Sequence, residues 1–339
     1  MKKLIYLIAF ISFSCLQAQT SYTSILAAGL EDSKAFMHGY LKPGTESLMY
    51  SINNGWFSTA EAKPFLGFEI SFIGNVAVVD ERKRTFTFNV TNLDGLTFSD
   101  GSTSNEVATV LGVVDPDVMM EYTFQDPVTG QTETIEIKLP ESLTSEDVNM
   151  LPSGFLQASI GLLKGTELKV RVFPNIEING NTVGLFGGGI QHEFTKWLPS
   201  DKLWPVAISG LVAYSQLDAE YAMEDVSVVD GDQQRIENLT KTWLFQGIVS
   251  TRLPVINFYA GFGYITGSST SDLKGEYEVY DVDTGVVTSV KDPLSITHDI
   301  SGVRTTLGTR LKLGFFRLNA DYTFAEYNTT SVGVSFGFR

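Results

Sequence analysis

The residues best suited to acid–base or metal chemistry are few and far apart in this 339-residue chain. Its three histidines, His38, His192 and His298, lie in different segments without the spacing of a metal-binding motif. Ser295, His298 and Asp299 could supply a nucleophile and its base, although a junction between a loop and a strand explains the same residues. The motifs of serine hydrolases, phosphate-binding loops and dinucleotide folds are absent. We therefore predict no catalytic residue, no metal and no cofactor.

A second set of ionisable residues is ordered by an alternation in the sequence. Between Val303 and Leu313, mostly apolar residues occupy one parity, while arginine, threonine and lysine occupy much of the other. A period of two is typical of a β-strand, whose successive side chains point to opposite faces. An apolar face opposite a charged face is the pattern of a transmembrane β-barrel with a polar lumen. We predict that the lumen is lined by Glu69, Lys169, Arg171, Arg304, Arg310, Lys312, Arg317 and Asp321.

Two interpretations of this charged face remain open. A small barrel needs mixed charges simply to fill its lumen with paired groups. If the same side chains line water instead, their excess of cations favours anionic solutes.

The segments that could carry these residues recur at regular intervals. The last three run from about Ser301 to Arg339, others follow one another from Gly154, and one more begins near Phe65. Short turns near Gly165, 198–202, 253–254 and Gly314 alternate with polar stretches at 218–238, 268–295 and 326–328, which we expect to be outer loops. The fold class is therefore all-β: a transmembrane antiparallel barrel of about 10–12 strands, with up to 14 possible.

The N-terminal part of the chain differs from the rest. Residues 1–19 combine a basic tip, a short apolar run and small polar residues, as a secretory signal peptide does. Residues 20–62 have loose helical spacing with a stop at Lys42-Pro43-Gly44. This helical or plug-like segment could lie in the lumen as a plug or in the periplasm, and a short amphipathic helix with a loop is equally compatible with it. The barrel then occupies residues 63–339. It is interrupted by an insertion at 92–153, which contains one hairpin and could lie in the lumen, on the rim or as a separate subdomain.

Composition fits an exported envelope protein. The formal net charge is −15, which makes nucleic acid an unsuitable partner. The one cysteine lies within the signal peptide, so the mature chain relies on no disulfide. The 23 Phe, 13 Tyr and 4 Trp suit the aromatic girdles of a barrel. We expect the interfacial aromatic side chains to include Trp197, Trp204, Trp243, Tyr322, Phe336 and Phe338.

Several strings of the sequence resemble an uncharacterised outer-membrane barrel family of Bacteroidota, a domain of unknown function. They include Gly39-Tyr40-Leu41-Lys42-Pro43, Gly67-Phe68-Glu69-Ile70, Ala108-Thr109-Val110-Leu111-Gly112, Gly161-Leu162-Leu163-Lys164-Gly165-Thr166-Glu167 and Gly187-Gly188-Gly189-Ile190-Gln191-His192-Glu193-Phe194. The resemblance covers nearly the whole mature chain and implies a barrel, but no activity. A plug-like segment before the strands also looks like the layout of the long-chain fatty-acid outer-membrane transporters.

Three functions are compatible with these features. The first, which we predict, is a passive transporter or pore for a small solute in the outer membrane of a Gram-negative bacterium. The second is a plugged structural or surface-interaction barrel, and the third is a hydrolase that uses His298 or His192. A secreted soluble β-sandwich is the alternative at the level of fold. The expected partners are outer-membrane lipids and, through the C-terminal strand, the barrel assembly machinery.

Overall fold

The fold was determined as a computed structural model, which describes residues 30–91, 93, 96–114, 116–125, 131–140, 142, 149–178, 180–199, 205–222, 231–281 and 286–338. The predicted signal peptide, residues 1–19, and Trp204 lie outside the described residues.

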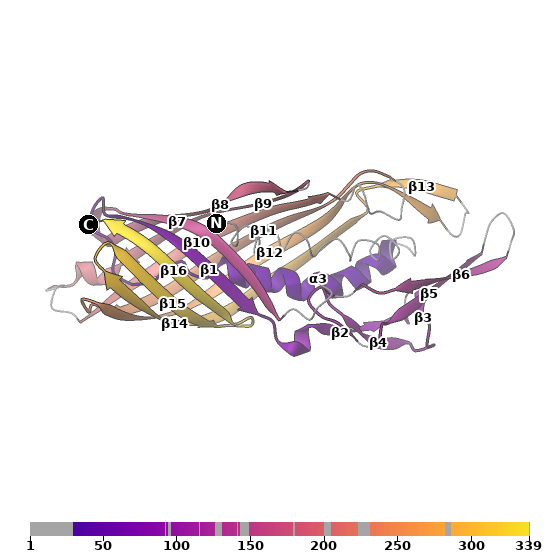
Figure 1. The fold of residues 1–339 in the computed structure, drawn as a ribbon, viewed down its shortest axis with the longest axis horizontal. Helices are drawn as coiled ribbons and strands as arrows, with labels where there is room; N and C mark the ends of the chain where they lie inside the picture. The colour runs from indigo at the N-terminus through magenta and orange to yellow at the C-terminus, as the bar shows by residue number, and fades with distance from the viewer. Residues whose placement is uncertain are drawn as a thin grey trace.

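Antiparallel strands form a closed barrel, as the alternation predicts (Figure 1). Leaving aside the strands of the insertion and one short outer strand, each barrel strand pairs with the barrel strands before and after it in the chain. The pairing of β11 with β12 closes the ring. The ten barrel strands are β1 (Phe68–Val78), β7 (Met150–Gly161), β8 (Thr166–Ile178), β9 (Asn181–Glu193), β10 (Val206–Ala222), β11 (Gly231–Thr251), β12 (Ile256–Asp281), β14 (Leu294–Leu313), β15 (Phe316–Phe324) and β16 (Thr329–Phe338). A closed barrel excludes the β-sandwich alternative.

The two ends of the barrel differ in their connections. The end that holds the C-terminus has short connections, among them the 3₁₀ turns η2 (Leu163–Gly165) and η3 (Phe194–Trp197); we call it the turn end. The other end, called the loop end here, holds the turn at 325–328, the strand β13 (Val286–Lys291) and the long insertion between β1 and β7. The two ends differ as predicted, but most of the expected loops 218–238 and 268–295 is strand, because β10 continues to Ala222, β11 begins at Gly231 and β12 continues to Asp281.

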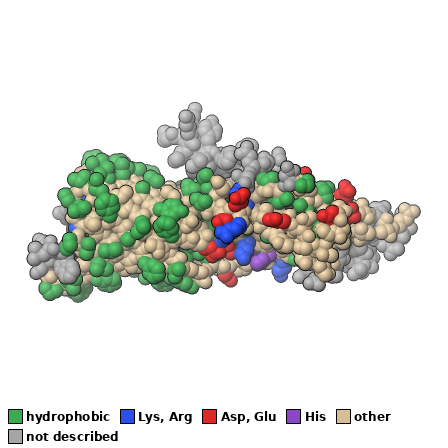
Figure 2. All heavy atoms as spheres, turned by 90° about the horizontal axis from the view of Figure 1, so that it is seen from below, with side chains coloured by type: hydrophobic (Ala, Val, Ile, Leu, Met, Phe, Trp, Pro, Cys, Tyr) green, Lys and Arg blue, Asp and Glu red, His purple; other side chains and the backbone are tan. Residues whose placement is uncertain are grey.

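The outer wall of the barrel is apolar over a limited height. On β1, Phe68, Ile70 and Phe72 point outward with 44%, 46% and 56% of their surface exposed. Figure 2 shows apolar side chains distributed over the barrel part of the molecule, with charged ones gathered where the barrel meets the insertion. Such a band is what a barrel presents to lipid.

The longest strands reverse their pattern at the edge of this band. On β12, Ile256, Phe258, Phe262 and Tyr264 are exposed, whereas farther along the strand Ile265, Leu273 and Tyr277 are buried inside and Glu276 and Glu278 are exposed. The apolar stretch covers about nine residues, the number a tilted strand needs to cross a bilayer. Residues 268–281 therefore continue β12 rather than form the predicted outer loop, and polar residues such as Glu276 and Glu278 give this part of the strand a loop-like composition.

In the described part of the chain, one α-helix, α3 (Leu30–Ile52), runs along the barrel axis. Its C-terminal end packs inside the wall, where Ile52 belongs to one hydrophobic cluster with Ile73, Phe155 and Leu185. Its N-terminal half lies at the loop end, where Phe36 packs on Phe88 of the insertion with ring centroids 5.4 Å apart. No helix in the described part of the chain is long and apolar enough to span a membrane.

The helix does not stop at Lys42-Pro43-Gly44, contrary to the prediction. The insertion packs against the helix at this point, and the Val110 amide donates to the Tyr40 carbonyl at 3.0 Å. A Cβ on Gly44 would lie 2.7 Å from Val110, so the glycine allows close packing here. Tertiary packing therefore overrides the local helix-breaking tendency of proline and glycine.

The insertion is a small folded unit on the rim at the loop end. It begins after β1, earlier than the predicted residue 92, and it ends before β7 at Met150, earlier than the predicted residue 153. β2 (Thr85–Asn89) pairs with β4 (Ser104–Ala108) in a separate sheet, so neither strand is part of the barrel wall. β3 (Leu96–Phe98), β5 (Met119–Gln125) and β6 (Thr132–Lys138) form a second small sheet. Side chains from these strands share a core with α3, so the helix ties the insertion to the barrel.

Candidate functional site

The candidate site is the barrel lumen together with residues 30–64, which we call the plug. The plug consists of α3 and the extended segment that follows it, and it leads from the loop end through the lumen to the start of β1. Between the end of α3 and the start of β1, the plug contacts the wall at three levels.

At the first level, the end of α3 is held by two buried arginines. Arg171 donates to the Ile52 carbonyl at 2.7 Å, and its guanidinium lies between the rings of Trp56 and Phe155, 4.0 and 3.8 Å from their centroids. Arg304 donates to the Asn53 carbonyl at 3.2 Å and to the side chain of Asn54. These contacts combine charge-assisted hydrogen bonds with cation–π attraction. Both arginines therefore bind the plug, not an open channel.

At the second level, Trp56 fills a space that the wall leaves open. A Cβ on Gly187 or Gly189 would lie 3.1 or 3.2 Å from the Trp56 ring, so two glycines of β9 make room for it. Gly188 lies between them and its added Cβ would meet nothing within 4 Å. The small inward side chains Ala207 and Ala213 of β10 belong to the same core. Shape complementarity thus fixes the plug as much as charge does.

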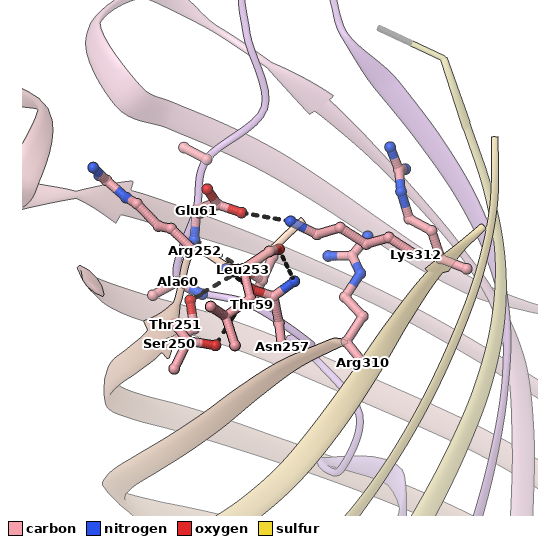
Figure 3. A network of polar contacts seen from close by, with 12 residues as sticks. Thr59, Ala60, Glu61, Ser250, Thr251, Arg252, Leu253, Asn257, Arg310 and Lys312 are labelled. Carbon is pink, nitrogen blue, oxygen red and sulfur yellow. Dashed lines mark hydrogen bonds and ion pairs between the residues drawn. The ribbon is translucent and has the colours of Figure 1, made fainter. Parts of the chain in front are cut away.

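At the third level, near the turn end, hydroxyl and amide contacts hold the last residues of the plug (Figure 3). Ser250 Oγ accepts from the Ala60 amide at 2.9 Å and lies 3.2 Å from Thr59 Oγ1. Lys312 Nζ pairs with Glu61 at 2.9 Å. The Ala62 amide donates to Glu193 at 2.7 Å.

Two buried glutamates organise the charges at this third level. Glu69 accepts from Arg310 at 2.5 Å and from Arg317, and Lys63 of the plug lies 3.6 Å away. Glu167 pairs with Lys63 at 2.8 Å and with Lys169 at 2.9 Å. Lys63 therefore bridges both carboxylates, and both have several cationic neighbours, which offset the cost of burying their charge.

The predicted lumen residues all belong to this arrangement. Glu69, Lys169, Arg310, Lys312 and Arg317 lie at the turn end, while Arg171, Arg304 and Asp321 lie deeper, where Asp321 accepts from Tyr259 at 2.8 Å. Every one of them has a protein partner.

Several functional residues were missed by the sequence reasoning. Glu167 shares the parity of Lys169 and Arg171, so extending that alternation by one step identifies it as an inward-facing residue. Lys63, Trp56 and Asn54 belong to the plug, which has no alternation to reveal an inward face.

The residues considered for hydrolysis do not come together. Along β14, His298 points into the barrel and is buried, whereas Ser295 and Asp299 face outward. His298 Nε2 lies 2.9 Å from the His38 carbonyl of α3, and Ser295 donates to Asp272 at 2.5 Å. Among the described residues, no group of three or more His, Cys, Asp and Glu side chains could hold a metal ion.

Five of the six predicted interfacial aromatics lie within the described residues, and all five are exposed. Trp197, Trp243, Phe338, Tyr322 and Phe336 expose 61%, 46%, 55%, 38% and 37% of their surface. The Trp197 indole donates to His192 at 2.8 Å, which fixes the ring at the turn end.

These features define a closed ten-stranded antiparallel barrel with an internal plug. Residues 1–338 match the model of a family of unknown function (DUF6588), and the chain belongs to that family. No curated protein matches the chain.

The solved structures with some likeness to this chain have low TM-scores. The translocator domain of the autotransporter NalP from Neisseria meningitidis is 12% identical, with 95% of this chain and all of that chain covered and a TM-score of 0.26. The transport unit of the autotransporter AIDA-I from Escherichia coli is 9% identical over 88% and 99% of the two chains, with a TM-score of 0.26. The toluene transporter TodX of P. putida is 9% identical over 80% and 89%, with a TM-score of 0.24.

Proposed function

We propose that this protein is an outer-membrane barrel that its own N-terminal segment keeps closed, and that its folded loop end is a surface for interaction. This proposal rests on the contacts that cationic side chains of the lumen make with the plug. Arg171 and Arg304 donate to backbone carbonyls at the end of α3, and Lys312 pairs with Glu61 of the plug. Cations that hold a plug in this way do not line a continuous aqueous path.

The apolar band and the alternation of short and long connections support a place in the outer membrane, with the loop end outside. In this proposal the chain is exported by the segment 1–19, and the C-terminal strand β16 guides its assembly into the membrane. The insertion, β13 and the long strands then form the part that reaches partners outside the cell.

Cross-linking tests whether the plug occupies the lumen in cells. Thr59→Cys with Ser250→Cys would join the plug to the wall, because the two hydroxyl oxygens lie 3.2 Å apart. Ser71→Cys with Ser335→Cys is the matched control, since these hydroxyls lie 2.8 Å apart on two neighbouring wall strands. We expect a disulfide in both pairs. A disulfide in the wall pair alone would show that the plug is elsewhere and would refute the proposal.

A gated path for a small anionic solute is the second candidate. It is favoured by buried polar atoms at the boundary of plug and wall that have no hydrogen-bond partner within the described residues: Asn53 Nδ2 and Oδ1, Trp56 Nε1, Gln191 Oε1 and Gln246 Oε1. Each such atom costs about 1–3 kcal/mol, which a shift of the plug toward a hydrated lumen would recover. In this case the oxidised Thr59–Ser250 cysteine pair blocks solute uptake and reduction restores it, while the wall pair has no effect.

A further inference from the structure

A depression of about 420 Å³ lies at the turn end, outside the barrel, between the two 3₁₀ turns η2 and η3. Lys63, Lys164 and Lys196 contribute its cationic lining, and Phe65, Leu162, Leu163 and Trp197 contribute its apolar lining, together with Pro64 and Gly165. Three lysines around one depression are notable in a chain whose net charge is −15.

The fold brings these lysines together through backbone features of the turns. Lys164 has a left-handed conformation, with φ of 58°, which is uncommon for a residue other than glycine. Gly165 follows with φ of 79°, and a Cβ there would lie 2.8 Å from Lys196 Cγ, so the stem of Lys196 lies close against the first turn. The two turns therefore pack against each other and present Lys164 and Lys196 on the same side.

The indole of Trp197 is held in a fixed orientation beside them. Its N–H donates to His192 Nε2 at 2.8 Å, and His192 Nδ1 lies 3.0 Å from Thr166 Oγ1. The Lys164 ammonium lies 5.4 Å from the centroid of the ring, within the range of cation–π attraction.

The depression also lies at the edge of the apolar band. Leu163, Phe65 and Trp197 expose 67%, 53% and 61% of their surface, and Phe68 and Leu168 begin the outward face of the adjoining strands. Tryptophan and lysine at this boundary meet the level of lipid headgroups, where acyl chains and phosphates lie side by side.

The charges behind the depression leave it cationic. Lys63 pairs with the buried Glu167, and Lys196 Nζ lies 4.0 Å from Glu193, which Arg252 already binds at 2.5 Å. Lys164 is exposed, and the side chain of Lys196 exposes 41% of its surface. A phosphate between Lys164 and Lys196 would complete the arrangement.

We propose that this depression binds the headgroup of an anionic phospholipid, with the phosphate between Lys164 and Lys196 and an acyl chain along Leu163 and Phe65. This inference rests on the proposed place of the barrel in a membrane. The bound lipid would fix the depth of the turn end in the bilayer.

Native mass spectrometry of the mature full-length protein in detergent tests the site, with phosphatidylglycerol compared against phosphatidylcholine. We expect retained phosphatidylglycerol and a loss of affinity of about fivefold for each lysine removed in Lys164→Gln and Lys164→Gln/Lys196→Gln. Lys241→Gln is the matched control, because Lys241 also lies beside a tryptophan, Trp243, in a second depression on the barrel wall. It should bind phosphatidylglycerol as the unaltered protein does.

Three outcomes would overturn the site: equal binding of the two lipids, unchanged binding by the double variant, or full displacement of the lipid by millimolar inorganic phosphate. The last result would mean that the site recognises a free anion. Flotation with liposomes separates this failure from that of the proposed function. A protein that inserts without preferring phosphatidylglycerol refutes only the lipid site, whereas a protein that does not insert refutes the membrane location as well. Heat-modifiable electrophoretic migration verifies that each variant is folded.

Discussion

Glu69 is the residue through which the wall and the plug share charge. Its carboxylate is buried and has three cationic neighbours, two from the wall strands β14 and β15 and one, Lys63, from the plug. A buried carboxylate in such a cluster holds together elements that are far apart in the sequence. Removing its charge leaves three cations with one fewer counter-charge in a region of low dielectric constant.

We predict that Glu69→Gln lowers the free energy of unfolding by roughly 3 kcal/mol. Asp117→Asn is the control, because Asp117 pairs with Lys138 at 2.7 Å but both side chains are about half exposed, 52% and 48%. That change should cost about 0–1 kcal/mol. Urea-induced unfolding in micelles compares the two. Equal losses would contradict the role assigned to Glu69.

Tyr327 also joins the wall to the plug, at the loop end. Its hydroxyl donates to Glu46 of α3 at 2.7 Å, and Lys83 lies 3.9 Å from the centroid of its ring. Burial, together with the hydrogen bond to Glu46, raises the pKa of Tyr327 well above its usual value. A raised pKa in the folded state means that this stabilisation is present below about pH 10 and is lost as the pH rises further.

We therefore predict a decrease in stability above about pH 10 that is smaller in Tyr327→Phe. Unfolding midpoints measured between pH 8 and pH 11 test this. Tyr322→Phe, on the outer face of β15, is the control and should keep the full decrease. The same decrease in Tyr327→Phe as in the unaltered protein would show that another group is responsible.

At the level of elements, the sequence predicts the strand segments that carry the apolar outer band. It does not predict the parts of β12 and β14 that continue beyond this band toward the loop end. Within the bilayer, the apolar outward face of Phe258 and Phe262 gives a recognisable alternation. Beyond it the alternation continues, but the apolar residues are now on the inward face. Leu294, Ile296 and Ile300 of β14 point inward, whereas Ser295 and Thr297 are exposed on the outside. A pattern that equates apolar with outward assigns these residues to loops.

The charges of the lumen were predictable because parity identifies an inward face. What they bind was not, since the contacts of Arg171 and Arg304 join residues more than one hundred positions apart. The continuation of α3 past Pro43 likewise depends on the insertion that packs around it, and local sequence carries no record of that packing.

The glycines of β9 give an element-level test of how the plug fits. Gly189→Val places side-chain atoms against Trp56, whereas Gly188→Val points away from the plug, where an added Cβ meets nothing within 4 Å. We predict that Gly189→Val displaces the plug and makes residues 53–64 sensitive to protease in folded protein, while Gly188→Val does not. Similar digestion of both variants would show that Trp56 does not fix the plug.

At the scale of the whole molecule, the path of the plug places the start of α3 at the loop end, beside the insertion. In an outer-membrane barrel with its loops outside, the chain at Leu30 therefore lies on the cell surface. We predict that an epitope tag placed directly before Leu30 binds antibody on intact cells, as does a tag in the turn at 326–328. A tag at Gly314, in a short connection of the turn end, should bind only after the cells are opened. The reverse pattern would invert the orientation.

Single-channel conductance in planar bilayers tests the central claim, that the plug closes the barrel, most directly. The intact mature protein is compared with a chain that lacks residues 20–62, after heat-modifiable migration has shown that both are folded. We predict silence from the intact protein and stable conductance steps from the shortened one, with anion preference reduced by Arg310→Glu. Stable steps of equal size from both proteins would contradict the account, because the lumen would then be open while the plug is in place.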